Sequence, residues 1–145
     1  MRAVPGIALL SAALAAAYAF AAPASPPPEP ESCDPAYIFF QSGVAAVAPE
    51  ELPAISGVAR TLLRNKFSAV VTGHTDAQEG DDKVLSERRA AAVKQELMCL
   101  GVKAETLETS GRGLSEPLTP SAPGIAESFN RYVIIDFCGP DRFRK

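Results

Sequence analysis

The feature that most limits the fold of this chain is a short apolar run at residues 69–72 followed, beyond a polar loop, by a long amphipathic stretch. The run holds two valines and a threonine and predicts a strand. The stretch at residues 83–100 spaces its apolar side chains as one face of a helix does, and Gly101 supplies a left-handed stop. We expect that face to bury Leu85, Ala92, Val93, Leu97 and Leu100.

The rest of the chain repeats this alternation of apolar and amphipathic segments. Strands are predicted at residues 36–40, 106–109 and 131–137. A helix is predicted from Pro49, which suits a first helical turn, to about residue 65. Its apolar face should consist of Leu52, Ile55, Ala59 and Leu62. The fold class that follows is α/β (α+β), with helices packed on one sheet.

Length and composition leave room for one ordinary globular domain. The chain has 145 residues, of which 47% are hydrophobic and 21% are charged, so it can form one core but not two. Its net charge of −3 argues against nucleic-acid binding, because such binding depends on basic side chains that neutralise phosphates. We therefore expect no nucleic-acid partner.

The first 22 residues predict a secretory signal peptide, with a basic second residue, an alanine-rich apolar run and a small-x-small cleavage pattern at residues 19–21. The alternative is an uncleaved membrane anchor, but the apolar run is shorter than the roughly 20 residues that a spanning helix needs. Residues 23–32 are rich in proline and predict an extended linker. The domain should occupy residues 33–140, before a basic tail at residues 141–145. We expect no transmembrane segment in the mature chain.

Three cysteines in an exported chain predict one disulfide and one free thiol. Cys33 precedes the first predicted strand and Cys138 follows the last. If those strands are antiparallel neighbours, the start of one meets the end of the other, so we expect a bridge between Cys33 and Cys138. Chain entropy predicts that it contributes about 4 to 5 kcal/mol. Cys99 is expected to be a buried free thiol. The cysteines lack the paired spacing of a metal site, and none is expected.

A carboxylate and a guanidinium frame the loop between the second strand and the second helix. Asp76 lies where the strand ends, at the edge of the sheet where α/β folds bind ligands. Arg89 stands two turns into the helix, with a side chain that can point back to the helix start. If both groups are open to solvent, Arg89 can bind a ligand carboxylate while Asp76 accepts from the ligand's ammonium group. Spacing alone leaves a second interpretation, in which Asp76 and Arg89 form an ion pair that joins loop to helix.

Four separated motifs favour the ligand-binding interpretation. They are Gly73-His74-Thr75-Asp76, Leu85-Ser86-x-x-Arg89-Ala90-x-x-Val93, Ser110-Gly111-Arg112-Gly113-x-x-Glu116-Pro117 and Asn130-Arg131-x-Val133. In order and approximate spacing, they resemble the OmpA-like C-terminal peptidoglycan-associated domain family over about residues 38–137. The resemblance implies a βαβαβ–β fold with the helices on one mixed four-stranded sheet.

The resemblance also implies a function. It suggests a non-catalytic periplasmic module, associated with the outer membrane or cell wall, that binds the peptide stem of peptidoglycan without a cofactor. An aspartate and an arginine of the family bind the free end of meso-diaminopimelate. In this chain those roles fall to Asp76 and Arg89, with Thr75, Leu85 and Arg131 as pocket neighbours. The expected partner is diaminopimelate-type peptidoglycan, and an envelope protein is a further candidate.

The chain departs from the family pattern close to this pocket. The loop between Asp76 and Leu85 is two residues shorter than usual, and Asp82 stands where asparagine is common. Glu79 and its acidic neighbours would favour an ammonium group and repel a carboxylate; alternatively, they form only a solvated acidic loop. The alternative function is therefore an envelope scaffold, or a partner-binding paralogue with weakened peptidoglycan affinity. A hydrolase ranks third, because His74 has no visible nucleophile beside it and is expected to hold a turn.

Overall fold

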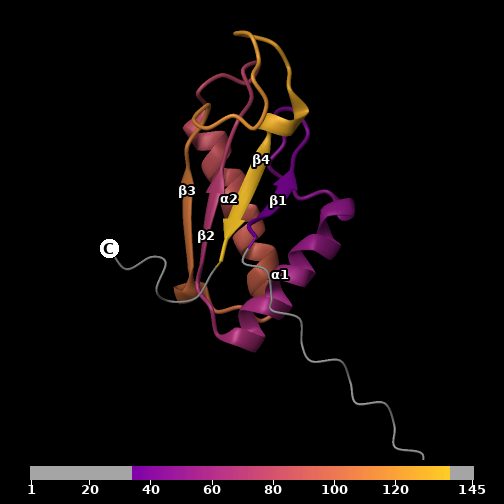
Figure 1. The fold of residues 1–145 in the computed structure, drawn as a ribbon, viewed down its shortest axis with the longest axis vertical. Helices are drawn as coiled ribbons and strands as arrows, with labels where there is room; N and C mark the ends of the chain where they lie inside the picture. Colours follow the sequence, from indigo (N-terminus) through magenta and orange to yellow (C-terminus); the bar gives the residue numbers. More distant parts are fainter. Residues whose placement is uncertain (1–33, 138–145) are drawn as a thin grey trace, which may run out of the picture. The chain divides into compact units, whose positions relative to one another are not determined.

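The computed structural model describes residues 34–137, which form one four-stranded sheet with two helices on it (Figure 1). The predicted strands and the second helix are present, with ends within one or two residues of those expected. Along the chain, the elements are β1 (Ala36–Phe39), the 3-10 turn η1 (Pro49–Glu51), α1 (Leu52–Asn65), β2 (Ala69–Gly73), α2 (Lys83–Cys99), η2 (Ala104–Thr106), β3 (Leu107–Gly111), η3 (Ser128–Asn130) and β4 (Tyr132–Asp136).

The strand order across the sheet is β1-β4-β2-β3. β2 and β3 are parallel, so α2 is the crossover between them, and β4 is antiparallel to both of its neighbours. Consequently β1, β2 and β3 all end at the same edge of the sheet, where β4 begins. We call this the upper edge, since it is at the top of Figure 1, where the long loop between β3 and β4 also lies.

One hydrophobic core lies between the sheet and the two helices. Its members come from all four strands, both helices and the segments that follow them. Removing their apolar surface from water is the main favourable term in folding. The core consists of Ile38, Phe40, Ile55, Val58, Ala59, Leu62, Ala69, Val71, Ala90, Val93, Leu97, Val102, Leu107, Val133, Ile135 and Phe137.

Two leucines predicted for the buried helix faces are exposed instead. Leu52 is the first residue of α1 and directly follows the 3-10 turn η1. Leu100 lies one residue beyond the end of α2, just before Gly101 takes a φ of +98°. Ala92 is half-buried. Leu85, also predicted for that face, is half-buried as well. The helical period therefore predicts the fully buried Ile55, Val93 and Leu97 and fails for the leucines at the helix ends.

Two glycines allow α2 to lie close to the sheet at the upper edge. Gly73 and Gly111 are paired at the ends of β2 and β3. A Cβ atom at Gly73 would overlap the backbone carbonyl of Ser86, and one at Gly111 would lie 2.5 Å from the Ser86 hydroxyl. That hydroxyl accepts from the Gly113 amide at 3.1 Å. The start of α2, and with it Arg89, is therefore held against the ends of both strands.

The cysteine predictions have different outcomes. Cys99 is a free cysteine but is exposed, so the prediction that it is buried is wrong. It follows the buried Leu97 by two residues, about 200° around the helix, and so faces away from the core. Cys33 and Cys138 lie outside the described residues, as do the predicted signal peptide, linker and basic tail. The antiparallel β1–β4 pairing on which that predicted bridge depends is present. Among the described helices, none is long and apolar enough to cross a membrane.

Candidate functional site

Asp76 and Arg89 both lie at the upper edge, but neither is open to solvent. Asp76 follows β2 by three residues, and Arg89 lies in the second turn of α2. Both residues are 0% exposed. The expectation that both stand open to a ligand is therefore wrong for this structure. A direct ion pair between them is also wrong, because each is paired with a different side chain.

Every N–H group of the Arg89 guanidinium has an acceptor. Its Nε donates to the carbonyl of Val44 at 2.9 Å. The two terminal nitrogens donate to the carbonyls of His74 and Gln41, each at 3.0 Å. Their remaining N–H groups bind both oxygens of the Glu79 carboxylate, at 2.6 and 2.8 Å. Three backbone carbonyls thus fix the guanidinium in place, and a carboxylate fills its bidentate edge.

Glu79 connects Arg89 to Asp76. Its side chain is 4% exposed. Besides Arg89, its carboxylate accepts from the backbone amides of Gly43 at 2.8 Å and Asp76 at 3.2 Å. Its own backbone amide donates to the Asp76 carboxylate at 2.9 Å. Glu79 therefore presents an N–H donor to Asp76 and a carboxylate to Arg89, the two kinds of group that the free end of an amino acid would present.

The second oxygen of Asp76 accepts from the Arg131 guanidinium at 2.7 Å and from the Glu127 amide at 2.9 Å. Burial by itself would raise the pKa of the Asp76 carboxyl, but the donors from Glu79, Glu127 and Arg131 outweigh it and hold that pKa below its ordinary value. Asp76 is therefore charged at neutral pH. We call Asp76, Glu79, Arg89 and Arg131 the charge cluster. Its two carboxylates balance its two guanidinium groups, which lowers the cost of burial.

Two predicted neighbours of the pocket lie beside Asp76. Arg131 contacts it directly, and the Arg131 Nε donates to the carbonyl of Phe40 at 3.0 Å. Thr75 precedes Asp76 in the chain and is 3% exposed. The Thr75 hydroxyl donates to the carbonyl of Gly80 at 2.7 Å. Both side chains therefore support the loop that carries Asp76 and Glu79.

Leu85, the remaining predicted neighbour, lies half-buried in the first turn of α2. Its amide donates to the Asp82 carboxylate at 2.9 Å. Asp82 is therefore the N-cap of α2, a position where a carboxylate stabilises both the unpaired amide and the helix dipole. The Leu85 amide is therefore paired within the chain.

His74 supports the upper edge as a structural side chain. Its buried ring stacks on Tyr132 with the centroids 4.3 Å apart. Nδ1 lies 2.6 Å from the carbonyl of Ser115 and so carries the proton, while Nε2 has no hydrogen-bond partner among the described residues. Burial lowers the pKa of the imidazole in spite of the Ser115 carbonyl, which favours the charged form. The neutral ring ties β2 to the loop after β3.

Sequence reasoning alone misses several members of this network, among them Glu79 as a partner of Arg89 and the carbonyls of Gln41 and Val44. The available signal for Glu79 is that this acidic residue lies in the loop between Asp76 and the helix that carries Arg89. The two carbonyls belong to the backbone after β1 and carry no side-chain signal.

A cavity of about 380 Å³ lies at the upper edge. Thr75 and Ala77, the chain neighbours of Asp76, line it, but no member of the charge cluster does. We call it the upper cavity. Its lining residues are Thr75, Ala77, Leu114, Pro117, Pro120, Ser121, Pro123, Gly124 and Asn130.

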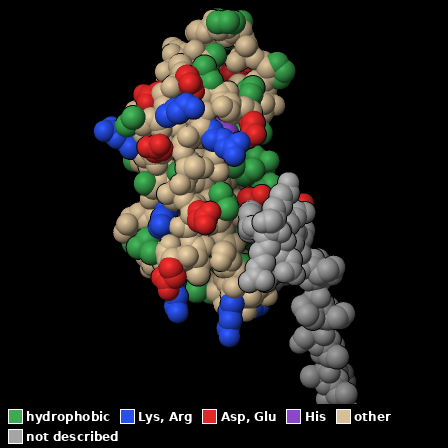
Figure 2. All heavy atoms as spheres, turned by 90° about the vertical axis from the view of Figure 1, so that its left-hand side faces the viewer, with side chains coloured by type: hydrophobic (Ala, Val, Ile, Leu, Met, Phe, Trp, Pro, Cys, Tyr) green, Lys and Arg blue, Asp and Glu red, His purple; other side chains and the backbone are tan. Residues whose placement is uncertain are grey.

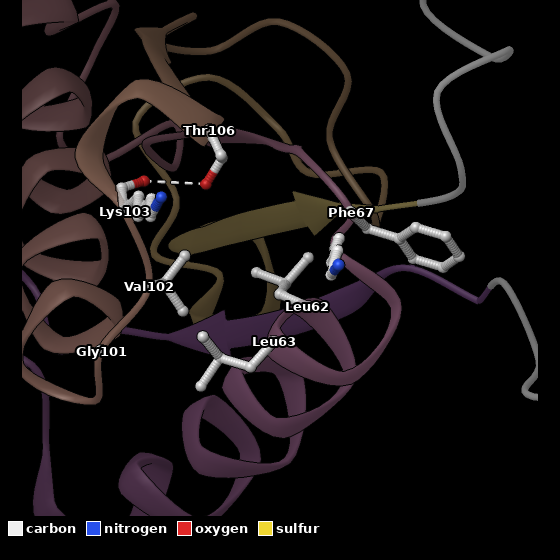
Figure 3. Close-up of a pocket in the computed structure, with 8 residues that line it drawn as sticks. Leu62, Leu63, Phe67, Gly101, Val102, Lys103 and Thr106 are labelled. Carbon is white, nitrogen blue, oxygen red and sulfur yellow. Dashed lines mark hydrogen bonds between the residues drawn. The ribbon is translucent and has the colours of Figure 1, made fainter.

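A second cavity, of about 320 Å³, lies at the opposite end of the sheet, where α1 ends and β2 and β3 begin (Figure 3). Apolar side chains such as Leu62 and Val102 surround it. Lys66 and Lys103 also line it, and none of its lining residues is acidic. It therefore lacks a carboxylate that could bind an ammonium group, unlike the upper edge.

Acidic and basic side chains are interspersed on the face along β3 (Figure 2). On that face they do not form the basic stripe that nucleic-acid binding needs. Within residues 34–137, no group of three acidic, histidine or cysteine side chains is arranged to hold a metal ion.

Comparison with known sequences gives a family match. A model described as the OmpA family matches residues 39–131. The chain is 32% identical over 101 residues to the outer-membrane lipoprotein YfiB of Pseudomonas aeruginosa, covering 68% of this chain and 60% of YfiB. It is 33% identical over 104 residues to the probable lipoprotein YiaD of Escherichia coli, covering 70% of this chain and 48% of YiaD. The chain thus spans about half the length of these relatives.

Solved structures share the fold. The peptidoglycan-associated lipoprotein from Burkholderia pseudomallei superimposes with a TM-score of 0.65 at 20% identity, covering 70% of this chain and 89% of that one. The cell wall anchor of the T6SS from Pseudomonas aeruginosa gives a TM-score of 0.58 at 29% identity, covering 70% and 78%. These likenesses confirm the expected fold of helices on a mixed four-stranded sheet.

Proposed function

This chain belongs to the OmpA family, and from that premise we propose that it is a peptidoglycan-binding module of the bacterial cell envelope. The proposed ligand is the stem peptide that carries meso-diaminopimelate. The proposed location is the periplasm, close to the outer membrane or the cell wall. We propose that the module binds without catalysis and without a cofactor. The names of similar proteins, an outer-membrane lipoprotein and a cell wall anchor among them, support this assignment.

The observation that carries the proposal is that an oriented guanidinium, Arg89, and a charged carboxylate, Asp76, lie close together at the upper edge. Three carbonyls orient the Arg89 guanidinium, and hydrogen bonds keep Asp76 charged. The free end of diaminopimelate has an ammonium and a carboxylate on one carbon. In the proposed complex, Arg89 binds that carboxylate and Asp76 binds that ammonium. Thr75, Leu85 and Arg131 are the proposed neighbours, and the upper cavity is the proposed place for the next part of the stem.

Sedimentation with purified sacculi tests this proposal. The protein should pellet with diaminopimelate-type sacculi and poorly with lysine-type sacculi. Asp76→Asn keeps the shape of the side chain and removes its charge. It should weaken binding about tenfold or more, because a hydrogen bond to a charged group contributes roughly 1.5–3 kcal/mol. Glu108→Gln is the matched control, since it removes one carboxylate charge at an exposed position. This variant should pellet like the wild type.

Folding must be measured alongside binding, because Asp76 is buried and its loss of charge also affects the charge cluster. A melting curve of each variant shows whether it is folded at the assay temperature and so separates the two effects. If a folded Asp76→Asn variant pellets as well as the wild type, Asp76 does not bind the ligand and the proposed recognition is wrong. Release of soluble fragments from the sacculi would instead indicate a hydrolase.

A specific observation favours a second candidate, an envelope scaffold with weakened peptidoglycan affinity. Groups of the chain itself already occupy all five N–H donors of Arg89 and both oxygens of Asp76. For such a scaffold, the wild type would pellet weakly with both kinds of sacculi, and Asp76→Asn would change nothing. The sedimentation assay therefore separates the two functions.

A further inference from the structure

We infer that Glu79 is an internal competitor that occupies the site and leaves it only for a ligand carrying both a carboxylate and an ammonium group. This inference rests on the proposed function and deepens it, because it names the residue that controls access to Asp76 and Arg89. It also defines the ligand chemistry that can open the site.

The first step concerns the carboxylate. Glu79 binds both terminal nitrogens of Arg89, so a second carboxylate cannot take the same bidentate edge while Glu79 is there. The guanidinium does not depend on Glu79 for its position, because carbonyls of Gln41, Val44 and His74 hold its other three N–H groups. A ligand carboxylate can therefore replace that of Glu79 without moving Arg89, and the arginine charge stays compensated.

The second step concerns the donor. The Glu79 amide supplies the hydrogen bond to one oxygen of Asp76, whereas Arg131 and Glu127 bind the other oxygen. If Glu79 leaves, only the first oxygen of the Asp76 carboxylate loses its partner. The amides of Gly43 and Asp76 also lose their acceptor, which a ligand carboxylate can replace. An ammonium group on the ligand restores the bond to the Asp76 oxygen. A ligand with carboxylates alone leaves the Asp76 oxygen buried and unpaired, which is unfavourable. The exchange therefore selects zwitterions.

The third step concerns how Glu79 can leave. It lies in a short turn between Asp76 and the N-cap of α2, and Gln78 beside it is exposed. Gly80 has a φ of +75°, with open space where a side chain would be. The turn holds itself through the Gly80 amide to the Asp76 carbonyl at 3.1 Å and the Thr75 hydroxyl to the Gly80 carbonyl at 2.7 Å. Movement of this turn releases Glu79 while β2 and α2 stay in place.

Titration calorimetry with two matched compounds tests the inference. Meso-diaminopimelate and pimelate share a seven-carbon dicarboxylate chain and differ only in the amino groups. Glu79→Gln and Glu79→Ala should bind meso-diaminopimelate about tenfold tighter than the wild type. In these variants the ligand no longer has to displace the Glu79 carboxylate from Arg89. Pimelate should bind the wild type more weakly than meso-diaminopimelate does, because it has no ammonium group to replace the Glu79 amide at Asp76. Glu108→Gln is the control of equal charge change, since Glu108 is exposed on edge strand β3, and it should match the wild type.

The outcomes separate this inference from the proposed function. If the wild type binds meso-diaminopimelate or diaminopimelate-type sacculi and the Glu79 variants bind no better, Glu79 is a structural partner of Arg89 and the inference is wrong. The same holds if the wild type binds pimelate as tightly as meso-diaminopimelate. If neither the wild type nor any Glu79 variant binds, the proposed function fails and takes the inference with it.

A second measurement on the wild type avoids the risk that a Glu79 variant does not fold. Hydrogen exchange is followed at single amides with and without saturating diaminopimelate-containing stem peptide. The Glu79 amide should lose protection in the complex, because the ligand's ammonium group replaces it as the donor to Asp76. The amides of β2 should keep their protection. A Glu79 amide that stays protected in the saturated complex would contradict the exchange.

Discussion

The hydrophobic core and the charge cluster are both largely buried, but different kinds of interaction stabilise them. In the core, side chains such as Ile38 and Leu97 are 0% exposed and contribute through contact area, which has little directional preference. In the charge cluster, Asp76 and Arg89 are equally buried, but each is stabilised by hydrogen bonds of defined geometry.

This difference shows where such a domain can be adapted for recognition. A core side chain can be exchanged for another of similar volume at modest cost. A buried ion is tolerated only while all its bonding groups are paired, so the charge cluster permits only like-for-like replacement. Exchange of the Glu79 carboxylate for a ligand carboxylate is a replacement of that kind.

The largest expected effect is on stability when the charge cluster is broken. Arg89→Ala should lower the free energy of unfolding by roughly 3–5 kcal/mol, because it leaves the Glu79 carboxylate buried without its partner. Denaturant unfolding measures this loss. Arg88→Ala removes the same kind of side chain from the exposed face of α2 and should change stability by no more than about 0.5 kcal/mol. If the two substitutions cost the same free energy of unfolding, the buried charge cluster does not contribute more than an exposed arginine.

A cavity in the core should cost somewhat less. Leu97→Ala is expected to lower the free energy of unfolding by about 3 kcal/mol, within the usual range for a fully buried leucine. Leu100→Ala is the control, because Leu100 is exposed just past the same helix. The same unfolding assay applies. A cost at Leu100 as large as at Leu97 would mean that the end of α2 packs more closely than the structure indicates.

A smaller effect on stability is expected where α2 lies close to the sheet, between the core and the charge cluster. Gly73→Ala should cost about 1–3 kcal/mol, because the new methyl group overlaps the Ser86 carbonyl and must push α2 outward. Gly57→Ala in α1 meets only the end of a flexible arginine side chain and should instead stabilise the protein by roughly 0.5–1 kcal/mol. Thermal unfolding of both variants measures the contrast. A stabilised Gly73→Ala variant would rule out the close contact.

The smallest expected effect is the pH dependence from His74. Because burial holds its pKa below the ordinary value of 6.5, the unfolded chain binds more protons at this residue. Its contribution to stability is therefore complete above pH 6.5 and is lost as the pH falls toward the folded-state pKa. His74→Phe keeps an aromatic ring against Tyr132 and should flatten this part of the curve. His74 is the chain's single histidine. If the dependence of stability on pH is unchanged in the variant, His74 is not the group that titrates.

Asp76 acts in a separate pH range. Its pKa is lowered in the folded state, so its contribution is present above the ordinary value of 3.8 and is lost as the pH falls below it. The two contributions can thus be distinguished in one pH series.

The elements of the fold were predictable because their signals are local. The apolar run before Gly73 and the helical period around Val93 place β2 and α2, and the glycine at 101 marks the helix stop. The predictions failed where the period ends. Leu52, Leu100 and Cys99 lie at helix termini, where one residue decides whether a side chain faces the core or the solvent.

The site was only partly predictable. Sequence motifs identified Asp76 and Arg89 and placed them at the same edge of the sheet. They did not indicate that Arg131 and Glu79 would be the actual partners, because these pairings join segments 55 and 10 residues apart in the chain. Two of the three carbonyls that fix Arg89 come from a loop more than 40 residues away.

By itself, the sequence determined the order of strands and helices, the family, and which charged residues gather at the upper edge. These follow from side-chain periodicity and from motifs within short segments. Only the tertiary structure decided that the two proposed ligand-binding groups are buried and that Glu79 stands between them. Hydrogen bonds and burial depend on atoms brought together by folding, so no count of residues along the chain could specify which acid meets which base.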